Sequence, residues 1–255
     1  MAEPVQEEIT EFYRSGQHAD AFIMQLDFEQ GRLRRHQDMA LQRLKTATGK
    51  NRVPLFALGG FQPIKGGRQA ADPQPGLGCS HSEAILRLKG LAAAPEKPEA
   101  PEVAALIAYF SGLLAAGLAK LLTRGDFGTL RPVFVSPLPG AETGALPWGL
   151  SRVLESACSQ AGAEFTYRPL LFRGASVAGV QTTENRPAQV NSLMPLRDPA
   201  VRNRFVVLVD DVVSSGYTLR AAGEVVNLYN EACARGLALA KTVATVRDQS
   251  GAEIL

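Results

Sequence analysis

The apolar run from Val206 to Val209, followed at once by Asp210 and Asp211, constrains the fold more than any other part of the sequence. The run is continuously apolar rather than alternating, as expected of a parallel strand that is buried on both faces. In open α/β sheets, ligands bind beyond the carboxyl ends of the strands. We therefore expect a buried strand from Phe205 to Val209 whose end presents two carboxylates to a ligand.

The segment after the aspartates has the composition of an anion-binding loop. Ser214, Ser215 and Gly216 supply hydroxyl groups and a permissive backbone, and a predicted helix follows from Thr218 to about Ala234. Consecutive backbone N–H groups at such a helix start can hold a phosphate, and the helix dipole favours a negative charge there. A phosphate site beside two carboxylate acceptors suits a ribose 5-phosphate.

The chain from about residue 102 onward alternates between helical and strand patterns, which predicts an α/β fold with a parallel, Rossmann-like sheet covered by helices. Residues 173–203 show no period and are predicted to form a long mobile loop. Arg235 and Gly236 are expected to close the last helix as a basic turn and a C′ glycine. The expected helices cover residues 102–122, 148–161 and 218–234, and the expected strands cover residues 133–135, 164–172, 205–209 and 241–246.

The chain before residue 82 has a different character. Residues 1–48 are polar with a helical pattern, whereas residues 49–80 are rich in glycine and proline, which predicts an irregular connection. We therefore predict a helical and Gly/Pro-rich extension over 1–81 and one domain over 82–255. The apolar segment 103–119 is shorter than the roughly 20 residues that span a bilayer, so we expect a buried helix there and no membrane contact.

Composition narrows the function classes. The formal net charge of +2 is too small to imply a nucleic-acid partner. The basic residues within 31–45 are interpreted as a solvated helix face, with nucleic-acid binding as the weaker alternative. The three cysteines form no CxxC pair, and the three histidines have no ligand-like spacing, so the protein alone should hold no metal. The acidic N-terminus lacks the apolar core of a secretory signal, which favours a cytoplasmic protein.

Residues 206–218, VVLVDDVVSSGYT, resemble the phosphoribosyl-pyrophosphate (PRPP) motif of type I phosphoribosyltransferases. The order of SEAILRLKG, PVFVSPLPG, LLFRG and ENRPAQVNSL before this motif is similar to ComF-type phosphoribosyltransferase-like proteins, over about residues 82–246. The resemblance implies that the two acidic residues hold the ribose hydroxyls and that the loop holds the 5-phosphate. The ribose-phosphate residues implied are Asp210, Asp211, Val212, Val213, Ser214, Ser215, Gly216, Tyr217 and Thr218, and the ring of Tyr217 is expected to stack on a base or to narrow the site.

The resemblance also places a pyrophosphate loop after the first sheet strand, at Pro139, Gly140, Ala141 and Glu142. Residues 136–151 contain no Lys or Arg, and Glu142 carries a negative charge where the pyrophosphate would bind. The chain also lacks the cysteine zinc module with which ComF-type chains commonly begin. The first of these departures puts pyrophosphate binding, and hence transfer, in question.

Other basic residues are candidates for the missing positive charge. In the family a mobile loop closes over the site, and Arg173 and Arg186 are the catalytic cations that the resemblance suggests within residues 173–203. Lys89 lies in the RLKG stretch, where ComF-like chains also carry a lysine. It is equally well interpreted as a surface lysine on a helix end.

The resemblance implies a magnesium-dependent phosphoribosyltransferase, a transferase of the glycosyltransferase class that serves nucleotide metabolism. It would act on PRPP or a nucleotide and a nitrogenous base, as a homo-oligomer, with Mg²⁺ entering together with the substrate. The alternative is a non-catalytic regulatory module that binds a phosphoribosyl ligand, with a ComF-like, DNA-related role. The acidic loop in residues 136–151 favours this alternative.

Overall fold

The computed structural model describes residues 37, 39–40, 53–61, 77, 79–140, 146–174, 186–242 and 253–255, with the backbone alone at residues 186, 187, 189, 253 and 254. The strands are β1 (Leu55–Ala57), β2 (Gly60–Phe61), β3 (Val133–Pro137), β4 (Phe165–Tyr167), β5 (Leu171–Arg173), β6 (Leu193–Pro195), β7 (Phe205–Val213), β8 (Cys233–Thr242) and β9 (Glu253–Ile254). The helices are α4 (His81–Gly90), α5 (Pro101–Thr123), α6 (Trp148–Ala161), α7 (Arg186–Asn191), α8 (Tyr217–Asn230) and the 3₁₀ turn η3 (Pro199–Val201).

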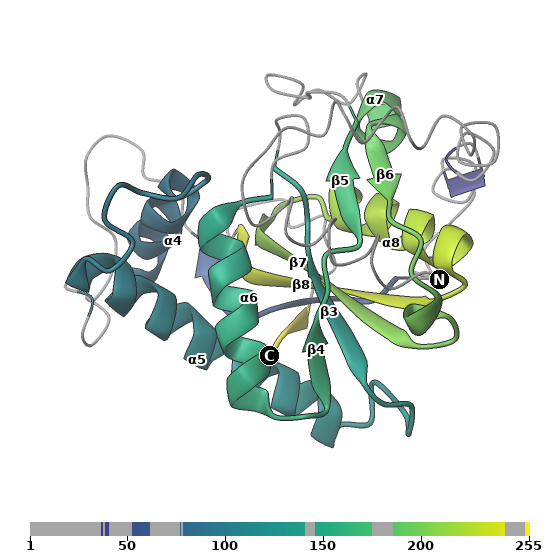
Figure 1. The fold of residues 1–255 in the computed structure, drawn as a ribbon, viewed down its shortest axis with the longest axis horizontal. Coiled ribbons are helices and arrows are strands. Elements are labelled where there is room, and N and C mark those ends of the chain that lie inside the picture. The colour runs from purple at the N-terminus through teal and green to yellow at the C-terminus, as the bar shows by residue number, and fades with distance from the viewer. Residues whose placement is uncertain are drawn as a thin grey trace.

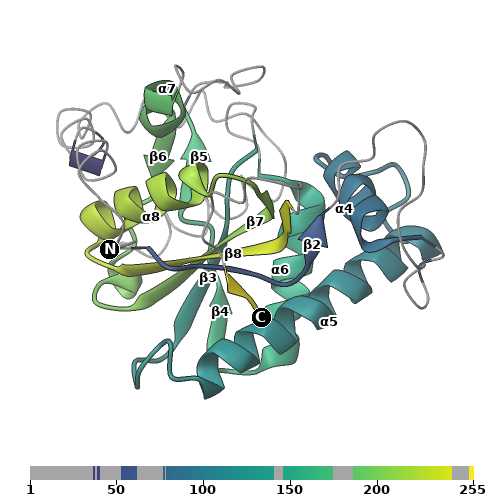
Figure 2. The ribbon, with the colours of Figure 1, turned by 180° about the vertical axis from the view of Figure 1, so that it is seen from behind.

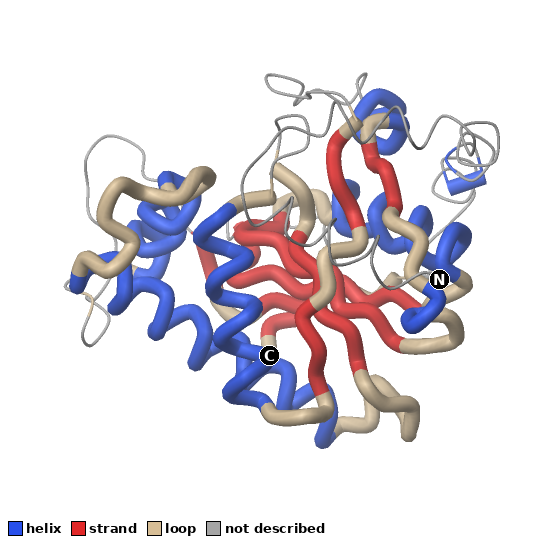
Figure 3. The backbone as a smooth tube through the Cα atoms, in the orientation of Figure 1, coloured by secondary structure: helices blue, strands red, loops and turns tan. Residues whose placement is uncertain are grey.

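A parallel sheet forms the centre of the molecule (Figures 1 and 3). Among the described residues it has seven strands in the order β4-β3-β7-β8-β1-β9, with β2 also beside β8, and every pairing is parallel. A separate pair of antiparallel strands, β5 and β6, stands over the sheet together with α7, which lies between the two strands in the chain. We call this pair the β5–β6 hairpin. The predicted α/β fold with a parallel sheet is therefore confirmed.

The central strand β7 has a hydrophobic core on each face. Val207 and Val209 belong to the core that also contains α4, α5 and α6. Val206 and Leu208 belong to the second core, with α8 and the β5–β6 hairpin. All four side chains are fully buried, which explains why the sequence of this strand is continuously apolar. The strand itself is longer than predicted, since it runs through both aspartates to Val213.

Helix α5 is the one helix in the described part of the chain whose length and composition would allow it to cross a membrane. One of its faces is buried in the first core, and the Ser111 hydroxyl donates to the carbonyl of Val153 in α6 at 3.2 Å. Figure 2 shows α5 lying along the sheet. This packing is that of the buried helix predicted from the sequence. The cytoplasmic location stays a prediction. The buried apolar side chains of α5 are Leu106, Phe110, Leu114, Leu118 and Leu121.

Two predictions about the middle of the chain are wrong. The strand expected over 164–172 is two strands in different sheets, because the chain leaves β3 after Tyr167 and Pro169 interrupts it. The segment 173–203 is not one long loop, since β5 ends in it and α7, β6 and η3 follow. Helix α6, in contrast, has the predicted bounds of 148–161.

The predicted end of the last helix is also wrong. Helix α8 ends at Asn230, and Glu231 makes the left-handed turn at φ 53°, so Arg235 and Gly236 lie inside β8 rather than at a helix end. The strand expected at 241–246 therefore begins eight residues earlier, at Cys233, and its described part ends at Thr242. A basic residue followed by glycine has the same local signature in both settings.

The irregular connection predicted for residues 49–80 is wrong over 55–61, where β1 and β2 pair with β8. The side chain of Leu55 explains two glycines that are distant in sequence. A Cβ atom at Gly216 would lie 2.4 Å from one Leu55 methyl, and a Cβ atom at Gly236 would lie 2.4 Å from the other. The boundary between extension and domain at residues 81 and 82 stays a prediction, although these two strands precede it.

Replacing Gly236 by alanine should destabilise the fold, because Leu55 is buried and cannot move aside freely. Overpacking of this kind costs about 1–3 kcal/mol in the free energy of unfolding. The matched control is Gly112→Ala on the exposed face of α5, where an added Cβ meets nothing within 4 Å. That change should stabilise by about 0.5–1 kcal/mol. Urea denaturation measures both, and equal effects of the two substitutions would contradict the Leu55 contact.

Candidate functional site

Asp210 and Asp211 occupy the carboxyl-terminal part of β7, as the sequence predicts. The alternation of side chains along β7 directs them to opposite faces of the sheet. Asp211 forms an ion pair with Lys89 of α4, Oδ1 to Nζ at 3.1 Å. Asp210 interacts electrostatically with Arg173 of β5 as well as with Lys89. The strand therefore ends between two cations that come from elements on its two sides.

The segment after β7 turns sharply into α8. Gly216 is the N-cap of α8 and has a left-handed φ of 71°, which favours glycine. The Ser215 hydroxyl accepts a hydrogen bond from the backbone N–H of Tyr217 at 3.3 Å, and Ser214 is exposed. The start of a 14-residue helix thus lies directly beyond the two carboxylates. This arrangement can hold an anion through backbone N–H groups and the helix dipole.

Tyr217 has a half-buried position. Its side chain packs against the second core, beside the residues that α8 buries. Thr218 is also half-buried, while Val213 is buried in the same core. Val213 thus anchors the start of the loop of residues 214–216 in the second core. The roles predicted for Tyr217 in base stacking and for Thr218 in phosphate binding stay predictions.

Arg173 lies in a strand and not in a mobile loop. Its side chain is 4% exposed, Nε donates to the carbonyl of Gly140 at 3.2 Å and Nη1 donates to the hydroxyl of Ser192 at 2.6 Å. Burial lowers the pKa of the guanidinium, and the charge of Asp210 opposes this shift. Arg173 therefore links the loop after β3 to the β5–β6 hairpin, and its charge interacts with that of Asp210. Its catalytic role stays a prediction.

The other predicted residues are placed only in part. Pro139 and Gly140 lie two and three residues after the end of β3, while Ala141 and Glu142 lie outside the described residues. Arg186 begins α7, and the position of its side chain is outside them too. The contact between Arg173 and Gly140 brings a cation to a segment that has none of its own.

The environment of Asp210 raises its pKa to about 7. Burial of the carboxylate is the largest cause, and the negative charge of Asp211 is the next. The backbone N–H of Asp211, which donates to Asp210 Oδ1 at 2.9 Å, acts in the opposite direction together with Lys89 and Arg173. The carboxyl group of Asp210 therefore keeps its proton to a higher pH than an ordinary aspartate does.

Sequence reasoning missed Arg220 in the first turn of α8. Its Nη1 donates to the carbonyl of Ser215 at 3.3 Å, and burial lowers the pKa of its guanidinium. Arg220 thus supports the loop of residues 214–216 from the helix side and adds a positive charge there. Its spacing of four residues from Gly216 on a predicted helix was the available signal, since one helical turn brings it back to the loop.

The described residues contain no group of three or more His, Cys, Asp or Glu side chains that could hold a metal. The protein donors at the site are the two carboxylates. Magnesium binding stays a prediction, in which the ion arrives together with the substrate phosphates.

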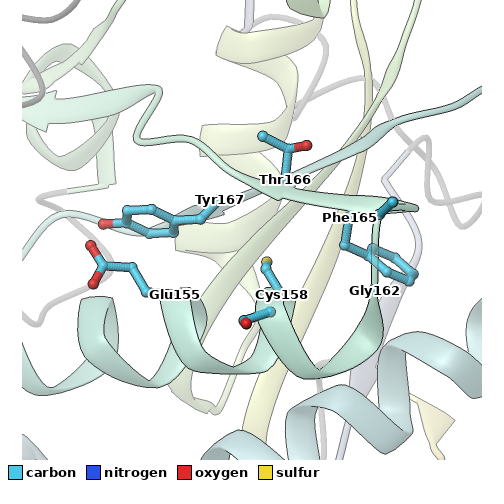
Figure 4. Close-up of a pocket in the computed structure, with 8 residues that line it drawn as sticks. Glu155, Cys158, Gly162, Phe165, Thr166 and Tyr167 are labelled. Atoms are coloured by element: carbon cyan, nitrogen blue, oxygen red, sulfur yellow. The ribbon is translucent and has the colours of Figure 1, made fainter.

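Cavities elsewhere in the molecule are separate from this site. One of about 640 Å³ lies between α6 and β4, and the side chains of Glu155, Cys158 and Tyr167 line it (Figure 4). Burial raises the pKa of the Cys158 thiol there to about 12, so the thiol is not a nucleophile at neutral pH. Another cavity of about 760 Å³ lies between the start of α5 and α4. None of the predicted ribose-phosphate residues lines either cavity.

Comparison with known proteins gives structural similarity only. No family model matches the sequence, and no curated protein matches it. A hypoxanthine phosphoribosyltransferase from Staphylococcus aureus is 14% identical, with 57% of this chain and 73% of that chain covered and a TM-score of 0.35. A hypoxanthine-guanine phosphoribosyltransferase from Bacillus anthracis is 14% identical, with 58% and 79% covered and a TM-score of 0.34. The residues of the site, and not these similarities, carry the functional proposal.

The raised pKa of Asp210 should make stability depend on pH. The folded-state pKa of about 7 lies above the value of about 3.9 expected in the unfolded chain. The folded state therefore binds more protons between these values, and the free energy of unfolding should fall as pH rises from about 4 to about 7. Since one pKa unit is worth about 1.4 kcal/mol, Asp210→Asn should remove a fall of a few kcal/mol.

Urea denaturation of both proteins at about pH 5 and about pH 8 measures this difference. The control is Glu164→Gln, an exposed carboxylate that pairs with Arg131 at the opposite end of the sheet, which should keep the wild-type dependence. The same pH slope in the wild type and in Asp210→Asn would show that Asp210 ionises normally.

Proposed function

We propose that the chain is a magnesium-dependent phosphoribosyltransferase that acts on PRPP or a nucleotide and a nitrogenous base. One observation carries the proposal. Asp210 and Asp211 lie at the end of a central parallel strand, and a loop with a left-handed glycine joins them directly to the start of α8. Carboxylate acceptors for two ribose hydroxyls and a backbone cradle for the 5-phosphate are thus adjacent.

The chemistry would rest on positioning and charge. Transfer breaks the bond between C1 of the ribose and a pyrophosphate oxygen, whose electron pair leaves with the pyrophosphate. A ring nitrogen of the base then bonds to C1, and the proton of that nitrogen passes to solvent water. Mg²⁺, when bound, neutralises part of the phosphate charge. Asp210 and Asp211 hold the sugar, and the cationic transition state gains from nearby carboxylate charge.

Lys89 is the residue that we assign to the pyrophosphate. It comes from the last turn of α4, its side chain is 45% exposed, and it now pairs with Asp211. A pair this exposed is worth only about 0.2–1 kcal/mol, so a ribose hydroxyl can displace it at small cost. The released ammonium group would then meet the pyrophosphate. This would supply a positive charge that residues 136–151 lack.

A non-catalytic module that binds a phosphoribosyl ligand is the second candidate. It is favoured by the sequence of residues 136–151, which has no Lys or Arg and contains Glu142. A ComF-like, DNA-related role would depend on the basic residues of segment 31–45. The described positions of this segment, 37, 39 and 40, carry uncharged residues. Magnesium dependence, oligomeric state and cytoplasmic location remain part of the proposal.

Calorimetric titration of PRPP with Mg²⁺ tests the ribose-phosphate site. The wild type should bind, and the double variant Asp210→Asn/Asp211→Asn should lose at least tenfold in affinity because both hydroxyl acceptors lose their charge. The control Glu164→Gln should bind as the wild type does. Absence of wild-type binding to both PRPP and ribose 5-phosphate would refute the proposal. If PRPP binds, a screen of bases for pyrophosphate release separates a transferase from a binding module.

Lys89→Gln tests the assignment of the pyrophosphate. The variant should bind PRPP about tenfold more weakly, the effect of losing about 1.4 kcal/mol, because one charge partner is gone. Its affinity for ribose 5-phosphate should be unchanged or slightly higher, since Asp211 no longer has to release an ion pair. Arg87→Gln, two residues earlier on α4 and paired with Glu83, is the control. Equal losses for both ligands would contradict the assignment.

A further inference from the structure

A short described part of the N-terminal extension, Gln37 with Met39 and Ala40, contacts the β5–β6 hairpin. The side chain of Gln37 is 6% exposed, and its amide nitrogen donates to two backbone carbonyls, of Asn191 at 3.0 Å and of Leu193 at 2.8 Å. Figure 1 shows this fragment in purple near α7 and β6. A buried amide that makes two hydrogen bonds of this kind fixes the position of the backbone that it meets.

Apolar packing supports the same contact. Ala40 is fully buried in the second core, among Leu171, Val190 and Leu193. Met39, on the same helical fragment, is 43% exposed. The fragment therefore buries one face against the hairpin and α7, and exposes the other.

The backbone that Gln37 contacts belongs to the strand that pairs with the strand of Arg173. Leu193 is the register partner of Arg173 in the antiparallel hairpin. The neighbouring Ser192 accepts a hydrogen bond from Arg173 Nη1, and the Ser192 carbonyl accepts one from the backbone N–H of Gly174 at 2.8 Å. Arg173 in turn donates to the carbonyl of Gly140, and its positive charge acts on Asp210. A chain of direct contacts thus runs from the extension to the candidate site.

We propose that Gln37 is a positioning residue for the acceptor side of the site, where it holds the hairpin so that Arg173 stays against Gly140 and Ser192. The proposal rests on the proposed function in placing a planar nitrogenous base on this side. If the sugar is held by β7 and its phosphate by the loop before α8, the hairpin and α7 are the described elements that stand over the sheet beside α8 (Figure 1), and Arg173 connects them to Gly140 after the neighbouring strand β3. The hydrogen bonds of Gln37 within the described part of the chain go to Asn191 and Leu193, and none goes to the residues that we assign to the ribose phosphate.

Gln37→Met is the sharpest test, because it keeps the length of the side chain and removes both donors. The KM for the base that releases pyrophosphate fastest in the screen should rise at least fivefold, while the dissociation constant for PRPP should stay within twofold of the wild type. Met39→Ala, on the exposed face of the same fragment, is the matched control and should change neither. A rise in both constants would indicate general loosening and would overturn the proposal, as would no change in either.

A second readout needs no enzymatic activity. The charged groups that act electrostatically on the carboxyl group of Asp210 are Asp211, Lys89 and Arg173. If Gln37→Met lets Arg173 withdraw, the carboxyl pKa of Asp210, followed by carbon-detected NMR titration, should rise above its wild-type value. Met39→Ala should leave it unchanged. A wild-type titration of Asp210 in folded Gln37→Met would overturn the proposal even if the chain transfers nothing.

The two proposals can therefore fail separately. Failure to bind PRPP would remove the proposed function, while the Asp210 titration would still decide whether Gln37 positions Arg173. Should Gln37→Met not fold, the milder Gln37→Asn keeps an amide that is one methylene too short to reach both carbonyls. It should shift the Asp210 titration in the same direction by a smaller amount, and an unshifted titration would again overturn the proposal.

Discussion

Two adjacent carboxylates at the end of a buried strand set the central electrostatic constraint of this molecule. Burial and mutual repulsion both disfavour ionised Asp210 beside Asp211, and this raises the pKa of Asp210. Two cations partly offset this effect, Lys89 from α4 and Arg173 from β5. The hairpin and α4 can thus be understood as supports that hold positive charge next to β7. A ligand that brings its own hydroxyl donors and a metal ion would relieve the same repulsion.

A steric constraint fixes the loop beside these charges. Leu55 places one methyl against Gly216 and the other against Gly236, so β1 supports both the loop before α8 and the neighbouring strand β8. Gly216 needs its missing Cβ for two reasons, its positive φ and this contact. A segment outside the recognised motif therefore shapes the loop. The backbone at the start of α8 is held by the packing of Leu55 against Gly216 and by the hydrogen bond from Arg220 to the carbonyl of Ser215.

Local pattern predicted the elements that carry their own signal. The apolar run before Asp210, the stripe of α5 and the bounds of α6 could all be found in the sequence, because burial on defined faces leaves a period. The pair Arg235-Gly236 led to a wrong prediction of a helix end. A glycine that is needed in a strand because Leu55 leaves no room for a Cβ atom looks the same in the sequence as a glycine that ends a helix. The positions of Gln37, Leu55 and Arg173 could not be predicted, because each depends on a partner far away in the chain. No local period records which carbonyl a buried amide will meet.

The same distinction bears on whether the site transfers or only binds. The sequence places no basic residue in 136–151, and by itself this favours binding. In the folded chain, however, Arg173 donates to Gly140 at the start of that segment, and Lys89 lies on the neighbouring carboxylate. Positive charge is thus supplied by other elements, at the cost of making the site depend on how the hairpin and α4 are held. A site assembled in this way would be sensitive to residues such as Gln37 that touch no substrate.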